Sequence, residues 1–164
     1  MLAREIGSEW GEDLANIMGY AIRDFNGDGV PELAIGYTSE YGACLSGLFT
    51  LADGIPRLVF GEVGDGYTCL QDGSFFYDGC RSASENGKGI YQLTDDGTAL
   101  SCREFYVLRM LDGDEATATV YYNTTGSWEI EDSRETNMTV DEFWSWVPEH
   151  ADLPLTPFIT ADGQ

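Results

Sequence analysis

Short runs of apolar, aromatic and β-branched residues alternate with polar turns from about residue 45 to residue 125. Runs this short with such a composition are typical of strands. Asp-Gly pairs punctuate the chain between them, and Asp-Gly between apolar runs is a strong hairpin signal. The pattern predicts an antiparallel β-meander over 45–125, in one twisted sheet or two packed sheets. The predicted strands are Leu48–Leu51, Arg57–Phe60, Ser74–Tyr77, Gly89–Leu93, Phe105–Leu108 and Thr117–Tyr122, and the pairs are Asp53-Gly54, Asp65-Gly66, Asp72-Gly73, Asp78-Gly79, Asp96-Gly97 and Asp112-Gly113.

The N-terminal segment has a different spacing of apolar residues. Trp10, Leu14 and Ile17 recur at intervals of three and four, which places them on one face of a helix. We therefore expect a helical segment over 1–18 that ends near Gly19.

A second helix is predicted near the C-terminus. Thr139 and Glu142 have the spacing of a capping box, in which each side chain satisfies a backbone N–H of the other residue. The helix should occupy 139–147 and stop before Pro148, because proline disfavours helical backbone in the residue that precedes it. Residues 148–164 then form an extended tail. The expected fold is a single domain of the mainly β (α+β) class with a helix at each end.

The most specific motif lies between the two predicted regions. Asp24, Asn26, Asp28 and Glu32 stand at positions 1, 3, 5 and 9 of a loop that has glycine at position 6. Calcium takes six to eight oxygen ligands, and loops with this spacing supply side-chain oxygens together with the carbonyl at position 7, here that of Val30. We predict one structural Ca²⁺ held by these five residues. The alternative is an ordinary acidic hairpin turn.

The flanking residues exclude a helix–loop–helix site. Position 12 is Ile35 instead of a bidentate glutamate, and Pro31 lacks the N–H through which two such loops pair. The segment Glu32–Tyr37 alternates as a strand does, and Tyr20–Arg23 can be extended. We expect a strand, the loop and a second strand over 19–38.

A calcium loop between two strands resembles the loops of FG-GAP repeats, found in integrin-type β-propellers. The ligand positions match, and an apolar residue, Leu33, follows them; Glu32 stands where the pattern has aspartate. The stretch from Tyr20 to Gly36 is also similar to secreted surface proteins and lipoproteins of Gram-positive anaerobes, in which a single such loop precedes a β-meander and a short C-terminal helix. The resemblance implies a bound metal ion and a location outside the cell or at its surface. It implies no particular enzymatic reaction. A second copy of the loop is not found, so a complete propeller is not expected.

Charge narrows the range of partners. The 164 residues include 29 acidic and 8 basic side chains, for a net charge of −21. Nucleic acids and anionic membranes are themselves negative and would be repelled. No apolar stretch approaches the length of a membrane span. No signal peptide is visible, so an exported protein would need a targeting segment outside this chain.

The number and spacing of the cysteines indicate the cellular compartment in which the protein works. Cys44, Cys69, Cys80 and Cys102 form no C-x-x-C pair, and His150 is the single histidine, which argues against a zinc site. An even number of cysteines beside a calcium loop suits an extracellular or cell-surface protein with up to two disulfides, in any of three pairings. The alternative is four free thiols in a cytosolic protein.

Two functional classes remain open. We expect a non-enzymatic binding or structural module, with a glycan or a surface protein as its partner, because exposed Trp and Tyr side chains stack on sugars and anchor proteins. Trp144 and Trp146 fall on different faces of a short helix, so at least one should be partly exposed; Tyr121, Tyr122 and Trp128 lie near a polar loop. The alternative is a secreted hydrolase that acts on glycans through a carboxylate pair. His150 has no nucleophile motif around it and is expected to be exposed.

Overall fold

The computed structural model describes residues 18–39, 42–61, 66–111 and 113–158. This part of the chain is mainly β, with all paired strands antiparallel in one sheet of eleven strands. The predicted fold class is therefore confirmed in its β content and in the single sheet. The helix predicted for 1–18 lies outside the described residues except for Met18, which begins the first strand.

The strands follow the predicted runs and add several short pairings. They are β1 (Met18–Arg23), β2 (Glu32–Ser39), β3 (Gly42–Ala52), β4 (Ile55–Phe60), β5 (Gly66–Cys69), β6 (Phe75–Ser82), β7 (Glu85–Leu93), β8 (Leu100–Leu111), β9 (Asp114–Asn123), β10 (Arg134–Glu135) and β11 (Thr156–Pro157).

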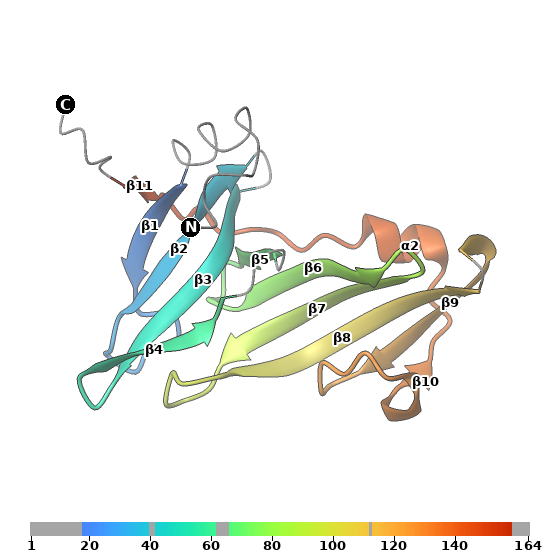
Figure 1. The fold of residues 1–164 in the computed structure, drawn as a ribbon, viewed down its shortest axis with the longest axis horizontal. Coiled ribbons are helices and arrows are strands. Elements are labelled where there is room, and N and C mark those ends of the chain that lie inside the picture. Colours follow the sequence, from blue (N-terminus) through green and yellow to red (C-terminus); the bar gives the residue numbers. More distant parts are fainter. Residues whose placement is uncertain (1–17, 40–41, 62–65, 112, 159–164) are drawn as a thin grey trace, which may run out of the picture.

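Neighbours in sequence are neighbours in the sheet almost throughout, as in a meander. The order is β10-β9-β8-β7-β6-β5-β3-β2-β1-β11, and β4 also pairs with β3. Strands β4 and β5 therefore follow each other along the same edge of β3. Figure 1 shows that strands β1–β3 run at a steep angle to strands β6–β9, so the strand direction turns through the sheet as its twist accumulates.

Among the described residues, some Asp-Gly pairs mark turns and Asp78-Gly79 does not; Asp65 lies outside the described residues, and Gly66 begins β5. Asp53 and Gly54 both have positive φ, 54° and 74°, which is the conformation of a two-residue hairpin loop, and they join β3 to β4. Asp78 and Gly79 instead lie inside β6, so the turn predicted there is wrong. The reason is strand pairing: Asp78 pairs with Gly66 of β5 and with Lys88 of β7, and Gly79 pairs with Gly87 of β7. The ring of Tyr77 covers Gly79, where an added Cβ would collide with it.

The core lies on one face of the β1–β3 region, whereas strands β6–β9 carry apolar clusters on both faces, since Val107 and Leu108 of β8 belong to different clusters. The largest cluster joins strand residues to the C-terminal segment; the buried members are Ala21, Phe25, Ala34, Ala43, Leu45, Leu48, Cys69, Phe75, Leu93, Ala151 and Leu153. Two smaller clusters centre on Phe105 and on Phe143. Since alternate residues of a strand face opposite sides, the apolar residues between these core positions face the other way.

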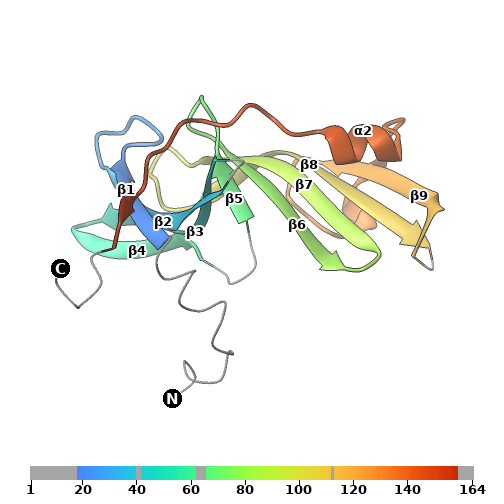
Figure 2. The same ribbon diagram turned by 90° about the horizontal axis from the view of Figure 1, so that it is seen from above.

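The predicted C-terminal helix is present as α2 (Val140–Ser145). Thr139 caps it, and both hydrogen bonds of the capping box with Glu142 are formed, so this prediction is confirmed. Phe143 is fully buried by the helix. After α2 the chain runs back beside the sheet and ends as β11 on the edge of β1 (Figures 1 and 2). A 3-10 turn at Ile130–Asp132 is the other helical element described, and neither has the length or hydropathy of a membrane-crossing helix.

Candidate functional site

The acidic loop joins β1 to β2, and the two strands pair up to its ends at Arg23 and Glu32. Asp24 closes the loop on itself: its Oδ1 accepts from the N–H of Gly27 at 2.7 Å and its Oδ2 from the N–H of Gly29 at 2.9 Å. Both glycines have positive φ, 78° and 89°, which they adopt without steric cost. The loop is therefore an ordered structure built around the side chain at its first position.

The next two predicted ligands bond to the loop and to another hairpin. Asn26 Oδ1 accepts from Asp28 N–H at 3.2 Å, and Asp28 Oδ1 accepts from Val30 N–H at 2.7 Å. The Asn26 amide nitrogen lies 3.1 Å from Asp28 Oδ2, 3.1 Å from the carbonyl oxygen of Thr94 and 3.5 Å from that of Asp95. A side-chain NH₂ group thus stands among three oxygens that come from the loop and from the β7–β8 turn.

Glu32 is the most unusual residue of the site because its side chain is fully buried, at 0% exposure. Its Oε2 accepts from Phe25 N–H at 3.0 Å and its Oε1 from the Thr50 hydroxyl at 3.3 Å. Burial raises the pKa of Glu32 above its ordinary value, and the charges of Asp28 and Asp24 raise it further, although the two hydrogen bonds oppose the shift. None of the ion pairs found among the described residues involves Glu32.

A small space beside Gly97 brings together oxygens of the loop, β3 and Glu32. A Cβ placed on Gly97 would lie 3.3 Å from Thr50 Oγ1, 3.4 Å from Glu32 Oε1 and 3.5 Å from Asp28 Oδ2. Gly97 itself has a φ of 66° in the β7–β8 turn. Three oxygens from three separate segments therefore surround one point, which a larger residue at position 97 would fill.

The five predicted ligands are only partly gathered. Asp28 and Glu32 approach the same point, whereas both oxygens of Asp24 face backbone N–H groups of the loop. In the part of the chain that the structure describes, no group of three His, Cys, Asp or Glu side chains is placed to hold a metal ion. Each carboxylate oxygen that accepts one N–H keeps a second acceptor position, so the donor set is of the hard, oxygen type that calcium prefers.

Sequence reasoning missed the contribution of the β7–β8 turn. Thr94 and Asp95 meet the loop through their carbonyl oxygens, and a carbonyl leaves no signature in the sequence. Asp96 serves the turn itself: the Thr94 hydroxyl, the Thr98 N–H and the Thr98 hydroxyl all donate to its Oδ1 and lower its pKa.

A second candidate site is a cleft of about 510 Å³ between the sheet and the segment that follows α2. It is lined by Tyr37, Ser39, Cys44, Gly66, Thr68, Phe76, Asp78, Lys88, Trp144, Val147 and His150. Trp144 is 40% exposed, whereas Trp146 is half-buried against Phe76 and Tyr106, so the prediction that at least one of the two is partly exposed is confirmed. The cleft thus combines an aromatic ring with several hydrogen-bonding side chains.

Lys88 fixes one wall of this cleft. It is only 3% exposed, and its Nζ donates to the carbonyl oxygens of Trp144 at 3.1 Å and Trp146 at 3.3 Å. The same nitrogen lies 3.5 Å from Asp78 Oδ2. Lys88 therefore ties the end of α2 to the sheet, and a cation is well placed there because carbonyls at a helix C-terminus carry partial negative charge.

Other predicted residues take structural positions. His150 is half-buried instead of exposed, in a bridge with Leu70 and beside the ring of Phe76. Trp128 packs on Phe105, with ring centroids 5.3 Å apart, so it is half-buried against a core cluster. Packing of aromatic rings against each other explains both positions.

The four cysteines form no disulfide in this structure, which is the alternative of four free thiols. Cys44, Cys69, Cys80 and Cys102 are all free thiols, placed on β3, β5, β6 and β8. Cys69 is buried, and burial raises the pKa of its thiol. An even number of cysteines makes disulfide pairing possible. A disulfide forms only where the fold brings two cysteines within a few ångströms of each other.

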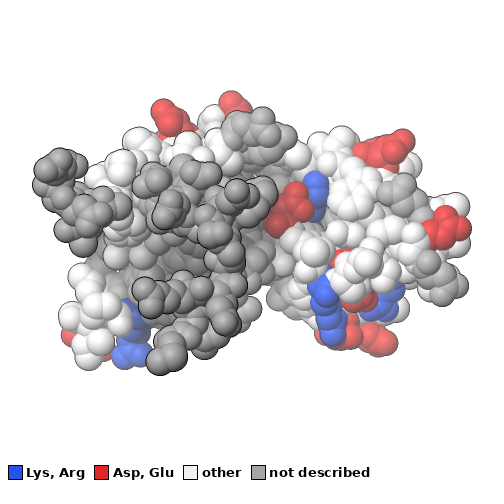
Figure 3. Space-filling view, turned by 45° about the horizontal axis from the view of Figure 1, so that its top comes forward, with Lys and Arg blue, Asp and Glu red and all other residues white. Residues whose placement is uncertain are grey.

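Acidic side chains do not gather into one patch on the face shown in Figure 3, where they are spread over both ends of the described surface. On this face the acidic side chains therefore do not by themselves mark a site. No protein-family profile, curated protein sequence or solved structure matches the chain. The candidate sites rest on their own geometry.

Proposed function

We propose that this chain is a calcium-stabilised binding module that acts outside the cell or at its surface. The observation that carries the proposal is the fully buried Glu32 carboxylate, which lies beside the acidic Asp28 and in no ion pair among the described residues. Burying a carboxylate without a counter-charge is costly, and a bound cation removes that cost.

The ligands we propose are the side chains of Asp24, Asn26, Asp28 and Glu32 and the carbonyl of Val30. The oxygen-only donor set favours calcium over zinc or copper, which prefer nitrogen and sulfur. Asn26 would ligate through Oδ1, which accepts from the Asp28 N–H at 3.2 Å and keeps a second acceptor position. When bound, calcium supplies positive charge to the loop.

The role proposed for calcium is structural. The loop joins two paired strands, and it touches the β7–β8 turn far along the chain, so a cation there would fasten two hairpins together. A switch needs an element with two arrangements, such as the helix pair of a sensor EF-hand, whereas β1 is paired with β2 along its whole length.

The test is thermal unfolding of the full chain in EDTA, in millimolar calcium and in millimolar magnesium. Calcium at 100 times its dissociation constant should stabilise the protein by about 2.7 kcal/mol. Asp24→Ala should abolish calcium binding in a titration and bring the melting temperature in calcium down to that of the metal-free protein. Equal calcium affinity in this variant, or no stabilisation of the parent protein, would overturn the loop assignment.

The cleft supports a binding role over a hydrolytic one. Glycoside hydrolysis requires two carboxyl groups about 5–9 Å apart, and among the described residues that line the cleft Asp78 is the single carboxylate. The exposed ring of Trp144 and the hydroxyls of Tyr37 and Ser39 line the same cleft and offer stacking and hydrogen bonds, which suit a neutral sugar. We therefore propose a glycan ligand for this cleft, and no nucleic acid or anionic membrane, because the net charge is −21.

Affinity electrophoresis through gels that contain soluble polysaccharides tests this ligand class. The parent protein should be retarded by at least one polysaccharide, and Trp144→Ala should migrate as it does in an empty gel. Leu111→Ala is the matched control, because Leu111 is exposed and lies on β8 outside the cleft. Release of reducing sugar that Asp78→Asn abolishes would instead favour the hydrolase.

A further inference from the structure

One face of the β1–β4 region is apolar although it does not face the core. Ile22 of β1 pairs with Leu33 of β2, Leu33 pairs with Phe49 of β3, and Phe49 pairs with Leu58 of β4. Ile22 is 65% exposed, Leu58 54% and Leu33 36%. Ala34 of the core follows Leu33 along β2 and faces the other side of the sheet. This part of the sheet is therefore apolar on both sides.

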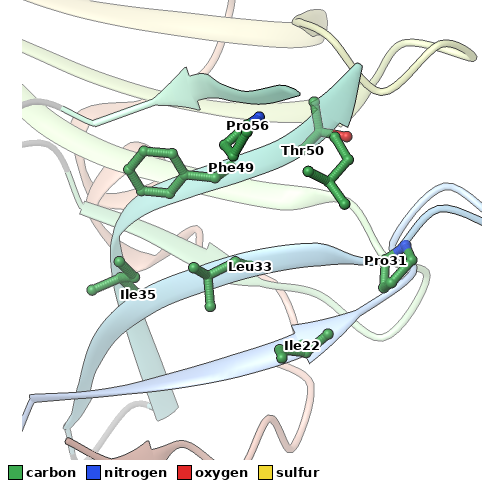
Figure 4. A pocket seen from close by; sticks show the side chains of 8 residues that line it. Ile22, Pro31, Leu33, Ile35, Phe49, Thr50 and Pro56 are labelled. Atoms are coloured by element: carbon green, nitrogen blue, oxygen red, sulfur yellow. The ribbon is translucent and has the colours of Figure 1, made fainter. Parts of the chain in front are cut away.

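The exposed side of these strands forms a groove of about 460 Å³. Pro31, Leu33 and Ile35 alternate along it, and Figure 4 shows Ile22 on one side of Leu33 and Phe49 on the other. At about 3.3 Å per residue, the three alternate residues extend over about 13 Å. Two strand spacings of about 4.8 Å separate β1 from β3. The groove is thus longer along β2 than it is wide.

The lining has the chemistry of a site for an uncharged apolar ligand. None of the eight described residues that line the groove is ionisable, although 23% of the residues of the chain are charged. Thr50 is the one member of this lining with a hydroxyl; it is 3% exposed and donates to the buried carboxylate of Glu32. Ligand pockets typically have volumes of about 300–1,000 Å³ and mainly apolar walls. A charged group would lose its hydration in this groove and find no counter-charge among the lining residues.

We propose that the groove binds one uncharged lipid-like molecule, with its unbranched alkyl chain laid along β2. An extended chain follows an elongated groove, and each CH₂ group that leaves water contributes favourably to binding. The polar end of such a molecule, for example a hydroxyl, remains in solvent at the open side of the groove. No described residue lines both this groove and the cleft proposed to bind a glycan, so the groove is a second ligand site.

Size and charge favour this occupant over a second copy of the chain. Eight residues line the groove, whereas a stable protein–protein interface takes about 20–30 residues from each partner. Each copy has a net charge of −21, so two copies repel each other. The same charge repels the anion of a fatty acid, and the alkyl chain therefore belongs to an uncharged molecule.

Displacement of Nile red, a neutral dye that fluoresces in apolar surroundings, tests the proposal with the full chain. The parent protein should increase the fluorescence of the dye, and decanol should displace it. Decanoate has the same number of carbon atoms and should require a concentration about tenfold higher, because its carboxylate finds no counter-charge in the groove.

Variants locate the bound dye. Leu33→Glu places a carboxylate in the middle of the groove and should abolish dye binding. Leu51→Glu, at a position of the same lining that is 48% exposed, repeats the test on β3. Leu111→Glu is the matched control and should bind the dye as the parent does, because Leu111 is an exposed leucine on β8 outside the groove. A cooperative thermal melt of each variant shows that a loss of binding is not a loss of fold.

Three results would overturn the proposal. Equal displacement by decanol and decanoate would show that the site does not select an uncharged ligand. Dye binding that is absent from the parent protein, or that both Leu33→Glu and Leu51→Glu retain, would show that the groove is not an apolar ligand site. Dimers of the parent protein at micromolar concentration that Leu33→Glu converts to monomers, as measured by analytical ultracentrifugation, would show that a second copy covers the groove.

Discussion

The backbone N–H of Phe25 donates a 3.0 Å hydrogen bond to the buried carboxylate of Glu32, seven residues further along the chain. The bond closes the loop from inside, because Phe25 is itself buried against Phe75 with ring centroids 5.2 Å apart. The second and ninth residues of the loop are thus fixed by the core, and Asp28 between them is held at the surface. A loop anchored in this way needs little ordering when it binds an ion.

Gly97→Ala should weaken calcium binding. A Cβ there lies within 3.5 Å of Glu32 Oε1 and Asp28 Oδ2, and the φ of 66° strains any residue with a side chain. Gly113→Ala is the matched control, because Gly113 has a φ of 74° in another hairpin and no atom within 4 Å of the added Cβ. In EDTA both variants should lose about 1–2 kcal/mol of unfolding free energy. Calorimetric titration should show lower calcium affinity in Gly97→Ala alone; equal affinities would place the cation elsewhere.

The stability of the calcium-free protein should depend on the protonation of Glu32. Burial raises its pKa in the folded protein, so the stability that the protonated form provides is complete below the ordinary value of 4.5 and is lost as pH rises through the raised pKa. Glu32→Gln has no such titration. In EDTA, the parent protein should therefore lose unfolding free energy relative to Glu32→Gln as pH rises above 4.5. Parallel pH profiles from denaturant melts would contradict this.

Calcium should reverse that trend, since it binds the carboxylate form. The stabilisation by calcium should increase as pH rises through the same window in the parent protein. Glu32→Gln should show less stabilisation, with a weaker dependence on pH. Thermal melts at fixed calcium and graded pH provide the measurement.

Lys88→Met should destabilise the protein by about 1–3 kcal/mol. The substitution removes the Nζ group that donates to the carbonyls of Trp144 and Trp146, so those acceptors lose this partner. Lys88 is only 3% exposed. Arg81→Met is the control, because the pair that Arg81 makes with Glu129 is exposed and should contribute little. Urea unfolding of both variants checks the difference, and equal losses would show that Lys88 does not fasten α2 to the sheet.

The free thiols predict an order of reaction. Cys80 is exposed and should be alkylated first in the native protein, whereas Cys69 is buried, with a pKa raised by that burial, and should react last. Unfolded, unreduced protein should titrate with four thiols. Fewer than four would mean that disulfides form, as the sequence alone suggested.

The sequence by itself determined the strands, most of their turns and the capped helix. The strands depend on local periodicity and the turns on Asp-Gly chemistry. The helix depends on the capping box of Thr139 and Glu142. It also placed the acidic loop between two strands, through Pro31 and the alternation after Glu32. Only the tertiary structure decided that Asp78-Gly79 is strand, since β6 pairs there with β5 and with β7. It alone brought the Thr94 and Asp95 carbonyls and the space beside Gly97 to the loop, about seventy residues away. Contacts between segments so far apart depend on how the strands pair, and local pattern does not encode that pairing.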